Sequence, residues 1–247
     1  MEVSKKVVFI KDWILNYVNS MPVKAQSLVI GISGGVDSSV TSTLCAMTGL
    51  KTIILSMPIK QIKEQNDLSH LHKKWLSDKF NNVESHTLEL DGIFKNFENT
   101  LSGFKNEHGM ANSRARLRMA TLYQVAAANH GIVVGTGNKV EDFGVGFYTK
   151  YGDGGVDISP IADCTKTEVW ELGKELKIKD EIINAKPTDG LWDDARNDED
   201  QIGLSYPQIE EAMNNNTSEF YEKYLQIRKP NIHKMKSIPV CILPKKL

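Results

Sequence analysis

The chain has 247 residues, of which 40% are hydrophobic and 25% charged, a composition typical of a globular protein with one sizeable α/β core. Its formal net charge of −1 gives no indication of a nucleic-acid partner or of an anionic membrane surface. Cys45, Cys164 and Cys241 form no C-x-x-C pair, which argues against a disulfide framework or a metal cluster and favours buried thiols. Because no stretch reaches membrane-spanning length, we expect a cytoplasmic protein with a single domain over residues 1–247.

The first predicted element is an amphipathic helix over residues 6–19. Residues 28–39, L-V-I-G-I-S-G-G-V-D-S-S, then run from an apolar strand through a glycine-rich turn into a second helix. Such a turn lets the backbone approach an anion, and the free N–H groups at the helix N-terminus favour negative charge. Ser33, Ser38 and Ser39 add hydroxyl donors. This stretch therefore predicts a phosphate-binding loop.

The spacing within this loop excludes two common phosphate-binding motifs. A G-x-x-x-x-G-K-[ST] loop needs a lysine that does not follow these glycines, and Gly31, Gly34 and Gly35 do not fit G-x-G-x-x-G. The remaining pattern, S-G-G-x-D-S, resembles the pyrophosphate loop of the ATP pyrophosphatase superfamily, whose members cleave ATP between its α- and β-phosphates. The simpler alternative is a tight turn that needs glycine for its geometry alone.

Strands and helices alternate after the loop, with strands predicted over residues 52–57 and 83–90 and helices over 61–79 and 91–101. This order predicts an α/β fold with a doubly wound parallel sheet, Rossmann-like, that binds ligands at the carboxyl ends of its strands. His70 and His72 are two positions apart in the 61–79 helix, so they point in different directions and we expect a solvated face there.

The next helix, predicted over residues 112–129, opens with N-S-R-A-R-L-R. Because cations near a helix start oppose its dipole, Arg114, Arg116 and Arg118 favour an anionic partner over a solvated basic stripe. The fourth strand, I-V-V-G-T, leads into a glycine-rich loop over residues 147–157. Since α/β sheets bind ligands after their core strands, this loop is predicted to bind one.

The order of the motifs resembles that of ammonia-dependent NAD synthetases. S-G-G-V-D-S, N-S-R-A-R-L-R, G-T-G-N-K-V-E, F-Y-T-K-Y-G-D-G-G-V-D, C-T-K-T-E, K-P-T and H-K follow one another over about residues 6–239. The resemblance implies a fold of the adenine nucleotide alpha-hydrolase type. It also implies a ligation in which the nicotinate carboxylate of deamido-NAD attacks the α-phosphate of ATP, and ammonia converts the resulting acyl-adenylate into NAD and AMP. A glutamine-dependent relative would carry an additional amidohydrolase domain.

The resemblance also implies roles for individual residues. The positions that match ATP contacts are Gly31, Ser33, Gly34, Gly35, Val36, Asp37, Ser38, Ser39, Thr136, Lys166 and Thr188. The positions that match deamido-NAD contacts are Arg116, Lys150, Asp153, Asp157, His233 and Lys234. Asp37 and Glu141 match the ligands of Mg²⁺, which suits a hard cation that bridges phosphates. Asp153 and Lys166 are the expected catalytic residues, and we hypothesise that Asp153 orients or deprotonates the incoming ammonium.

The family's homodimers, with substrate sites at the subunit interface, imply a second copy of this chain. The helices over residues 6–19 and 112–129 are the candidate contacts. Residues 191–200, L-W-D-D-A-R-N-D-E-D, are typical of a solvated linker. The functional alternative is a mobile lid over residues 190–203 that excludes water from the acyl-adenylate. Two short helices are predicted over 206–213 and 218–227, and Pro230, Pro239 and Pro244 are expected to break up the tail.

Two other functions stay open. Another ATP pyrophosphatase-type enzyme, such as a GMP synthetase-like amidotransferase half or a tRNA-modifying ligase, would share the loop. A non-enzymatic nucleotide-binding module would need the loop but not Glu141, Lys166 or the 147–157 stretch.

Overall fold

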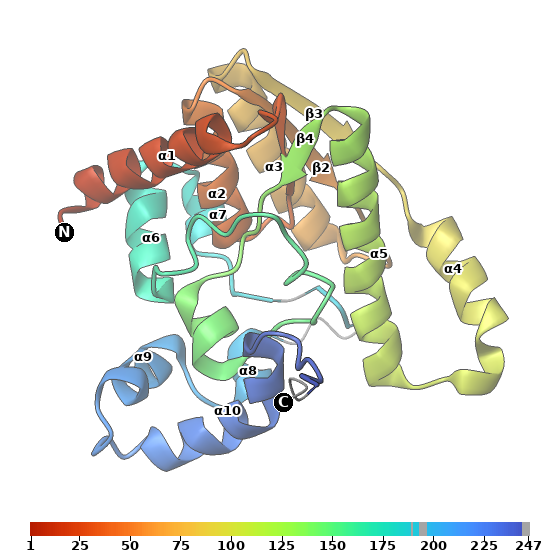
Figure 1. The fold of residues 1–247 in the computed structure, drawn as a ribbon, viewed down its shortest axis with the longest axis vertical. Helices are drawn as coiled ribbons and strands as arrows, with labels where there is room; N and C mark the ends of the chain where they lie inside the picture. The colour runs from red at the N-terminus through yellow and green to blue at the C-terminus, as the bar shows by residue number, and fades with distance from the viewer. Residues whose placement is uncertain (189, 193–196, 244–247) are drawn as a thin grey trace.

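The computed structural model describes residues 1–188, 190–192 and 197–243. In these ranges the strands form a four-stranded parallel sheet in the order β3-β2-β1-β4 (Figure 1). The strands are β1 Ser27–Gly31, β2 Lys51–Ser56, β3 Val83–Thr87 and β4 Gly131–Val133. The predicted parallel sheet is confirmed, and β1, which carries the glycine-rich loop, lies inside the sheet between β2 and β4.

The sheet is covered by helices on both faces, because successive strand residues point to opposite sides. Leu28 and Ile30 of β1 pack on one face, whereas Val29 between them packs on the other. The helices of the first face are α1 Val3–Ser20, α2 Val36–Met47, α3 Lys63–Lys79, α6 Lys166–Glu175 and α7 Asp180–Ile183. Those of the second face are α4 Asp91–Thr100 and α5 Glu107–Ala128, joined by the 3-10 helix η1 Ser102–Phe104.

A third apolar cluster lies apart from the sheet, below it in Figure 1. It is formed by the π-helix η2 Lys139–Val145 and by α8 Asp198–Ile202, α9 Tyr206–Asn214 and α10 Tyr221–Met235. Because η2 follows β4 closely, this group stands next to the carboxyl end of the sheet. Within the described ranges, no helix is both long and apolar enough to cross a bilayer.

Two predicted helix boundaries are wrong. α5 begins at Glu107, after an Asn106 cap whose Oδ1 accepts from the Gly109 N–H at 2.8 Å, so the arginines lie well inside the helix and the dipole argument does not apply to them. α10 runs through Pro230 to Met235 instead of ending near residue 227. On either side of Pro230, Arg228 and Lys234 donate to main-chain carbonyls between residues 143 and 148, and these contacts offset the lost helix hydrogen bond.

Two predictions about side-chain burial are also wrong. His72 is fully buried, with Nε2 2.9 Å from Ser42 Oγ, because α3 presents it to the core four residues before the buried Leu76. The predicted burial of Cys45 and Cys164 is confirmed, but Cys241 is exposed in the C-terminal segment.

Candidate active site

The glycine-rich loop forms a compact cradle between β1 and the N-terminus of α2. Gly34 has a φ of +95°, and a Cβ at this position would lie 2.7 Å from the Gln65 carbonyl oxygen, so the turn requires glycine. The Ser38 hydroxyl lies 3.1 Å from Ser33 Oγ and donates to the Gly35 carbonyl at 3.0 Å. Ser33 Oγ in turn accepts from the Gly35 N–H at 3.2 Å. The hydroxyls are therefore held beside the start of α2, where the helix dipole favours an anion.

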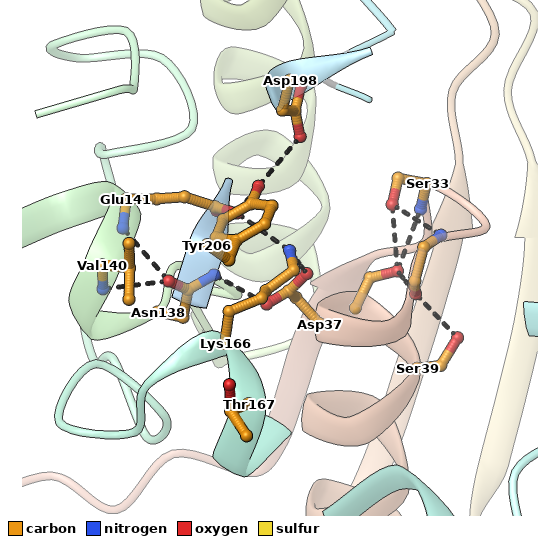
Figure 2. A network of polar contacts seen from close by, with 12 residues as sticks. Ser33, Asp37, Ser39, Asn138, Val140, Glu141, Lys166, Thr167, Asp198 and Tyr206 are labelled. Atoms are coloured by element: carbon orange, nitrogen blue, oxygen red, sulfur yellow. Dashed lines mark hydrogen bonds and ion pairs between the residues drawn. The ribbon is translucent and has the colours of Figure 1, made fainter. Parts of the chain in front are cut away.

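A buried ion triad lies directly behind the cradle (Figure 2). Lys166 Nζ is 2.6 Å from Asp37 Oδ2 and 2.8 Å from Glu141 Oε1, and the lysine side chain is 3% exposed. Asp37 comes from the first turn of α2, Glu141 from η2, and Lys166 is the first residue of α6. Asp37 thus meets Glu141 and Lys166, both of which lie more than 100 positions later in the sequence. The metal and phosphate roles of these residues stay a prediction.

Local structure explains how Lys166 reaches this point. Thr165 caps α6 in a capping box with Glu168, in which each side chain accepts from the other residue's N–H. A cation in the first turn of a helix opposes the helix dipole, so the two carboxylates are needed to stabilise it. Burial lowers the pKa of the Lys166 ammonium, but the charges of Asp37 and Glu141 raise it above its ordinary value. Lys166 is therefore charged.

Burial raises the pKa of both carboxyls, but the net shift differs between them. Burial raises the pKa of Asp37 above its ordinary value despite the nearby Lys166 ammonium. Burial also raises the pKa of Glu141, but Lys166 and the hydrogen bonds to this carboxyl outweigh that effect and hold its pKa below the ordinary value.

Two residues of this centre were missed in the sequence analysis. Asn138 is fully buried; its Nδ2 donates to Asp37 Oδ1 at 2.9 Å, and its Oδ1 accepts from the N–H groups of Val140 and Glu141. Tyr206, at the start of α9, is also fully buried and donates to Glu141 Oε1 at 2.7 Å. Asn138 lies within the G-T-G-N-K-V-E motif, so the motif could have pointed to it. Tyr206 lies 65 residues from Glu141 and outside every motif quoted above, so nothing in the sequence indicated its contact.

A cavity opens in front of the cradle, at the carboxyl ends of β1 and β2. Among its lining residues are Ser33 and Ser38 of the cradle, together with Thr136, Thr188 and Glu141. Apolar side chains of α5 and of the segments around it line the cavity as well: Met57, Met119, Leu122, Val134 and Val156. The cavity thus combines an apolar surface with an anion-binding end, as a nucleotide requires.

Some of the predicted ATP positions lie outside this lining. Val36 packs in the core, and Ser39 is fully buried with its hydroxyl donating to the Gly35 carbonyl at 3.0 Å. Each contributes to the cradle as part of the first turn of α2. Thr188 lines the cavity, and its Oγ1 accepts from Gln65 Nε2 at 3.3 Å.

The residues that match deamido-NAD contacts lie together around the 147–157 loop. Arg116 donates to the Lys150 carbonyl at 3.3 Å, and Lys150 donates to the His233 carbonyl at the same distance. Lys234 donates to the carbonyls of Gly146 and Tyr148, at 2.9 and 2.8 Å. Three cationic side chains are therefore gathered on main-chain carbonyls, an arrangement that suits an anionic ligand.

The two predicted aspartates have different surroundings. Asp153 lines the cavity, and its Oδ1 accepts from the Thr149 N–H at 2.9 Å. Asp157 instead accepts from the Val133 N–H at 2.8 Å and from the Tyr123 hydroxyl at 3.1 Å, and so extends the hydrogen bonding at the end of β4.

The predicted lid over residues 190–203 is partly described. Gly190 and Leu191 line the cavity, and α8 begins at Asp198 after an Asn197 cap. Asp198 is 5% exposed, so the prediction of a solvated linker is wrong at this position. Residues 193–196 of the predicted lid lie outside the described ranges.

Comparison with known proteins finds matches over the whole site. A family model described as NAD synthase matches residues 6–241. The NH(3)-dependent NAD(+) synthetase of Methanosarcina acetivorans is 38% identical over 187 residues, which cover 75% of this chain and 72% of that protein.

Solved structures match as well. The structure of the NMN synthetase from Francisella tularensis has a TM-score of 0.89 at 29% identity, with all of both chains covered. The NH3-dependent NAD synthetase of Campylobacter jejuni has a TM-score of 0.78 at 26% identity, with 98% of this chain and all of that chain covered.

Proposed function

This chain belongs to the NAD synthase family, and on that premise we propose that it is a ligase that uses ATP and ammonia to amidate deamido-NAD, giving NAD, AMP and pyrophosphate. The observation that carries this proposal is the junction of the cradle with the Asp37–Lys166–Glu141 triad at the edge of the partly apolar cavity. The cradle suits the departing pyrophosphate, and the triad supplies charge beside it.

In the proposed first step, the nicotinate carboxylate attacks the α-phosphate of ATP and the bond to the β-phosphate breaks. Ser33, Ser38 and the N–H groups of the first turn of α2 bind the pyrophosphate, whose charge grows as it leaves. Thr188, which lines the cavity, contacts the phosphates, and Lys166 supplies a buried positive charge. Such a reaction depends mainly on alignment and charge neutralisation.

The donor set fits Mg²⁺, because Asp37 Oδ2 and Glu141 Oε1 already converge on one cation, the Lys166 ammonium. Mg²⁺ is commonly held by one or two carboxylates together with substrate phosphates and waters. Asp37 and Glu141 would hold the ion, which would neutralise phosphate charge. Within the described ranges, no cluster of three or more Asp, Glu, His or Cys side chains offers another metal site.

In the proposed second step, ammonia attacks the acyl-adenylate carbonyl and AMP leaves. Arg116, Lys150, His233 and Lys234 surround the acceptor nucleotide, and Asp153 orients or deprotonates the ammonium at the cavity wall. We expect Asp153→Asn to lower turnover at saturating ammonia, and wild-type turnover across pH would contradict this role. Segment 190–203 is proposed to exclude water from the acyl-adenylate.

A second acceptor is supported by the Francisella tularensis NMN synthetase, which matches this chain over its whole length. In that case nicotinate mononucleotide would replace deamido-NAD. Both acceptors present the same nicotinate carboxylate and ribose phosphate, so the chemistry and the residues around the cradle would be the same. The two differ in the adenylate half, which a mononucleotide lacks.

The experiment that tests the function offers each acceptor separately to purified protein with Mg·ATP and ammonium chloride. The products are separated by liquid chromatography and identified by mass spectrometry, and AMP is scored against ADP. Amidated product with equal AMP supports the ligase, and the preferred acceptor is the one with the higher kcat/KM. AMP without an amide contradicts this acceptor class, and ADP contradicts cleavage at the α-phosphate.

The proposal includes a homodimer with substrate sites at the subunit interface, a single domain and a cytoplasmic location. The dimer is supported by the exposed apolar side chains on α1, Val8, Phe9, Trp13 and Tyr17. Trp13 and Tyr17 stack with ring centroids 5.9 Å apart, so they form one surface.

A further inference from the structure

Tyr206 connects the ion triad to the α8–α9 region, which carries none of the residues assigned above to substrates or metal. It is fully buried at the first position of α9. Its hydroxyl lies 2.7 Å from Glu141 Oε1 and 3.3 Å from Asp198 Oδ2 (Figure 2). Its N–H donates to Glu199 Oε1 at 2.9 Å, so both its main chain and its side chain are held by α8 residues.

The ring of Tyr206 is held as firmly as its hydroxyl. Trp170 of α6 packs edge-on against it, with centroids 5.9 Å apart and planes 84° from parallel. Lys166 Nζ lies 4.8 Å from the centre of the ring, within the range of a cation–π contact. Tyr206 therefore contacts two of the three charged groups of the triad, Lys166 through its ring and Glu141 through its hydroxyl.

The position of its single O–H proton follows from the distances. A phenol donates one hydrogen bond, and Glu141 Oε1 is closer than Asp198 Oδ2 by 0.6 Å. Glu141 Oε1 thus accepts from both Tyr206 and Lys166. Two donors from different elements determine the plane in which this carboxylate lies. For a metal ligand, such outer contacts set both orientation and affinity.

We propose that Tyr206 is a positioning residue, which orients the Glu141 carboxylate for a divalent cation. This inference rests on the proposed function, because the metal site is part of it. If the Tyr206 hydroxyl served packing alone, a main-chain carbonyl of the third apolar cluster would satisfy it equally well. Its observed partner is instead the Glu141 carboxylate. Tyr224, which lies in that same cluster and is also buried, has no contact with the triad among the described residues and provides the matched control.

The test compares Tyr206→Phe with Tyr224→Phe. Mn²⁺ is the probe, titrated by electron paramagnetic resonance against protein bound to an ATP analogue with a methylene group between its α- and β-phosphorus atoms. We expect Tyr206→Phe to bind Mn²⁺ about 10–100-fold more weakly than wild type, and Tyr224→Phe to bind it equally well. In assays, the apparent KM for Mg²⁺ should rise in Tyr206→Phe while the KM for the acceptor stays unchanged. Excess Mg²⁺ should then recover much of kcat, which a general loss of structure would not allow.

Asp198→Asn separates the two hydroxyl contacts. Because the proton goes to Glu141, removing the Asp198 charge should change Mn²⁺ affinity less than threefold. Unchanged affinity in Tyr206→Phe, an equal loss in Tyr224→Phe, or an equal loss in Asp198→Asn would each overturn the proposal. If Tyr206→Phe does not fold, 4-aminophenylalanine in place of Tyr206, which keeps an N–H donor at the position of the hydroxyl, should retain Mn²⁺ affinity within tenfold, and a greater loss would overturn the proposal. Failure of the wild type to amidate either nucleotide would contradict the proposed function without affecting this difference in Mn²⁺ affinity.

Discussion

At the scale of single residues, the site depends on Lys166 compensating two buried acids. Its ammonium is 2.6 and 2.8 Å from Asp37 and Glu141, so it occupies the place where carboxylates of like charge would otherwise repel each other. A lysine in this position is a stabilising group before substrate arrives and a source of positive charge afterwards. The same side chain thus serves both the fold and the proposed reaction.

We therefore expect Lys166→Met to lower the free energy of unfolding of the metal-free protein by about 3–5 kcal/mol, because it leaves two buried carboxylates without a cation. Mg²⁺ should restore part of this loss, since it binds the same two oxygens. Urea unfolding with and without Mg²⁺ measures both effects. Lys139→Met, whose partner Asp163 is 97% exposed, is the control, and its cost should be below about 1 kcal/mol. Equal losses in the two variants would contradict the buried role of Lys166.

His72 predicts a pH dependence of stability. Burial lowers its pKa from 6.5 to about 4, so the folded protein favours the neutral ring. The unfolded state then binds more protons between these values, and stability is lost as the pH falls from about 6.5 to about 4. The contribution is at most about 3 kcal/mol.

His72→Gln should therefore lose less stability than wild type between pH 7 and pH 4.5, as measured by urea unfolding at each pH. His70→Gln, at an exposed position of the same helix, should follow the wild-type profile. If the free energy of unfolding changed with pH in the same way in wild type and His72→Gln, His72 would not contribute to the loss of stability in acid.

The charged residues of the triad could be predicted from their motifs, because each stands beside glycines or a helix start with a clear signature. Asp37, Glu141 and Lys166 meet in one ion triad, and their roles toward metal and phosphates stay a prediction. Tyr206 could not be predicted, because nothing in a sequence distinguishes a buried tyrosine that bonds to a carboxylate from one that fills a core. His72 was misjudged for the related reason that polar residues can be buried wherever a partner such as Ser42 is available.

At the scale of elements, the turn between β1 and α2 sets the geometry of the cradle. Gly34 adopts φ +95°, and the chain there passes so close to α3 that a side chain has no space. The cradle therefore packs against α3 through one glycine of the loop. Any residue with a Cβ would displace either the loop or α3.

Gly34→Ala should cost about 1–3 kcal/mol of stability and weaken ATP binding, because both the backbone conformation and the contact with the Gln65 carbonyl become strained. Thermal unfolding and isothermal titration with the ATP analogue measure the two effects. Gly92→Ala is the control: a Cβ on this α4 residue meets nothing within 4 Å, so we expect unchanged ATP binding and equal or slightly higher stability. ATP binding at wild-type strength in Gly34→Ala would contradict the assigned cradle.

Hydrophobic periodicity predicted the order of the helices and strands, but it predicted the residues at which they begin and end less well. The start of α5 was missed because the capping asparagine precedes a polar stretch without apolar repeats. The end of α10 was missed because contacts with η2, distant in sequence, outweigh the local effect of Pro230. The π-helix η2 has no sequence signal of its own, although its cap, Asn138, lies in the motif that was recognised.

At the scale of the whole molecule, the proposed dimer predicts a particle of twice the 27.7 kDa chain mass in sedimentation velocity. Phe9→Glu on α1 and Ala120→Glu on α5 place a charge on the exposed side of each candidate contact helix. The variant at the true interface should sediment as a monomer, because burying an unpaired charge is costly. If both variants remain dimeric, neither helix forms the contact.

The position of β1 within the sheet also has a consequence for how the protein folds during its synthesis. β1 leaves the ribosome early, yet its partner β4 begins at residue 131, and Lys166, which compensates Asp37, follows still later. Over that interval the nascent chain carries an incomplete sheet and an unpaired acid. Contacts between such distant segments form slowly, since a long loop must close first. Nucleotide binding should therefore be the last property that a newly made or refolding molecule acquires.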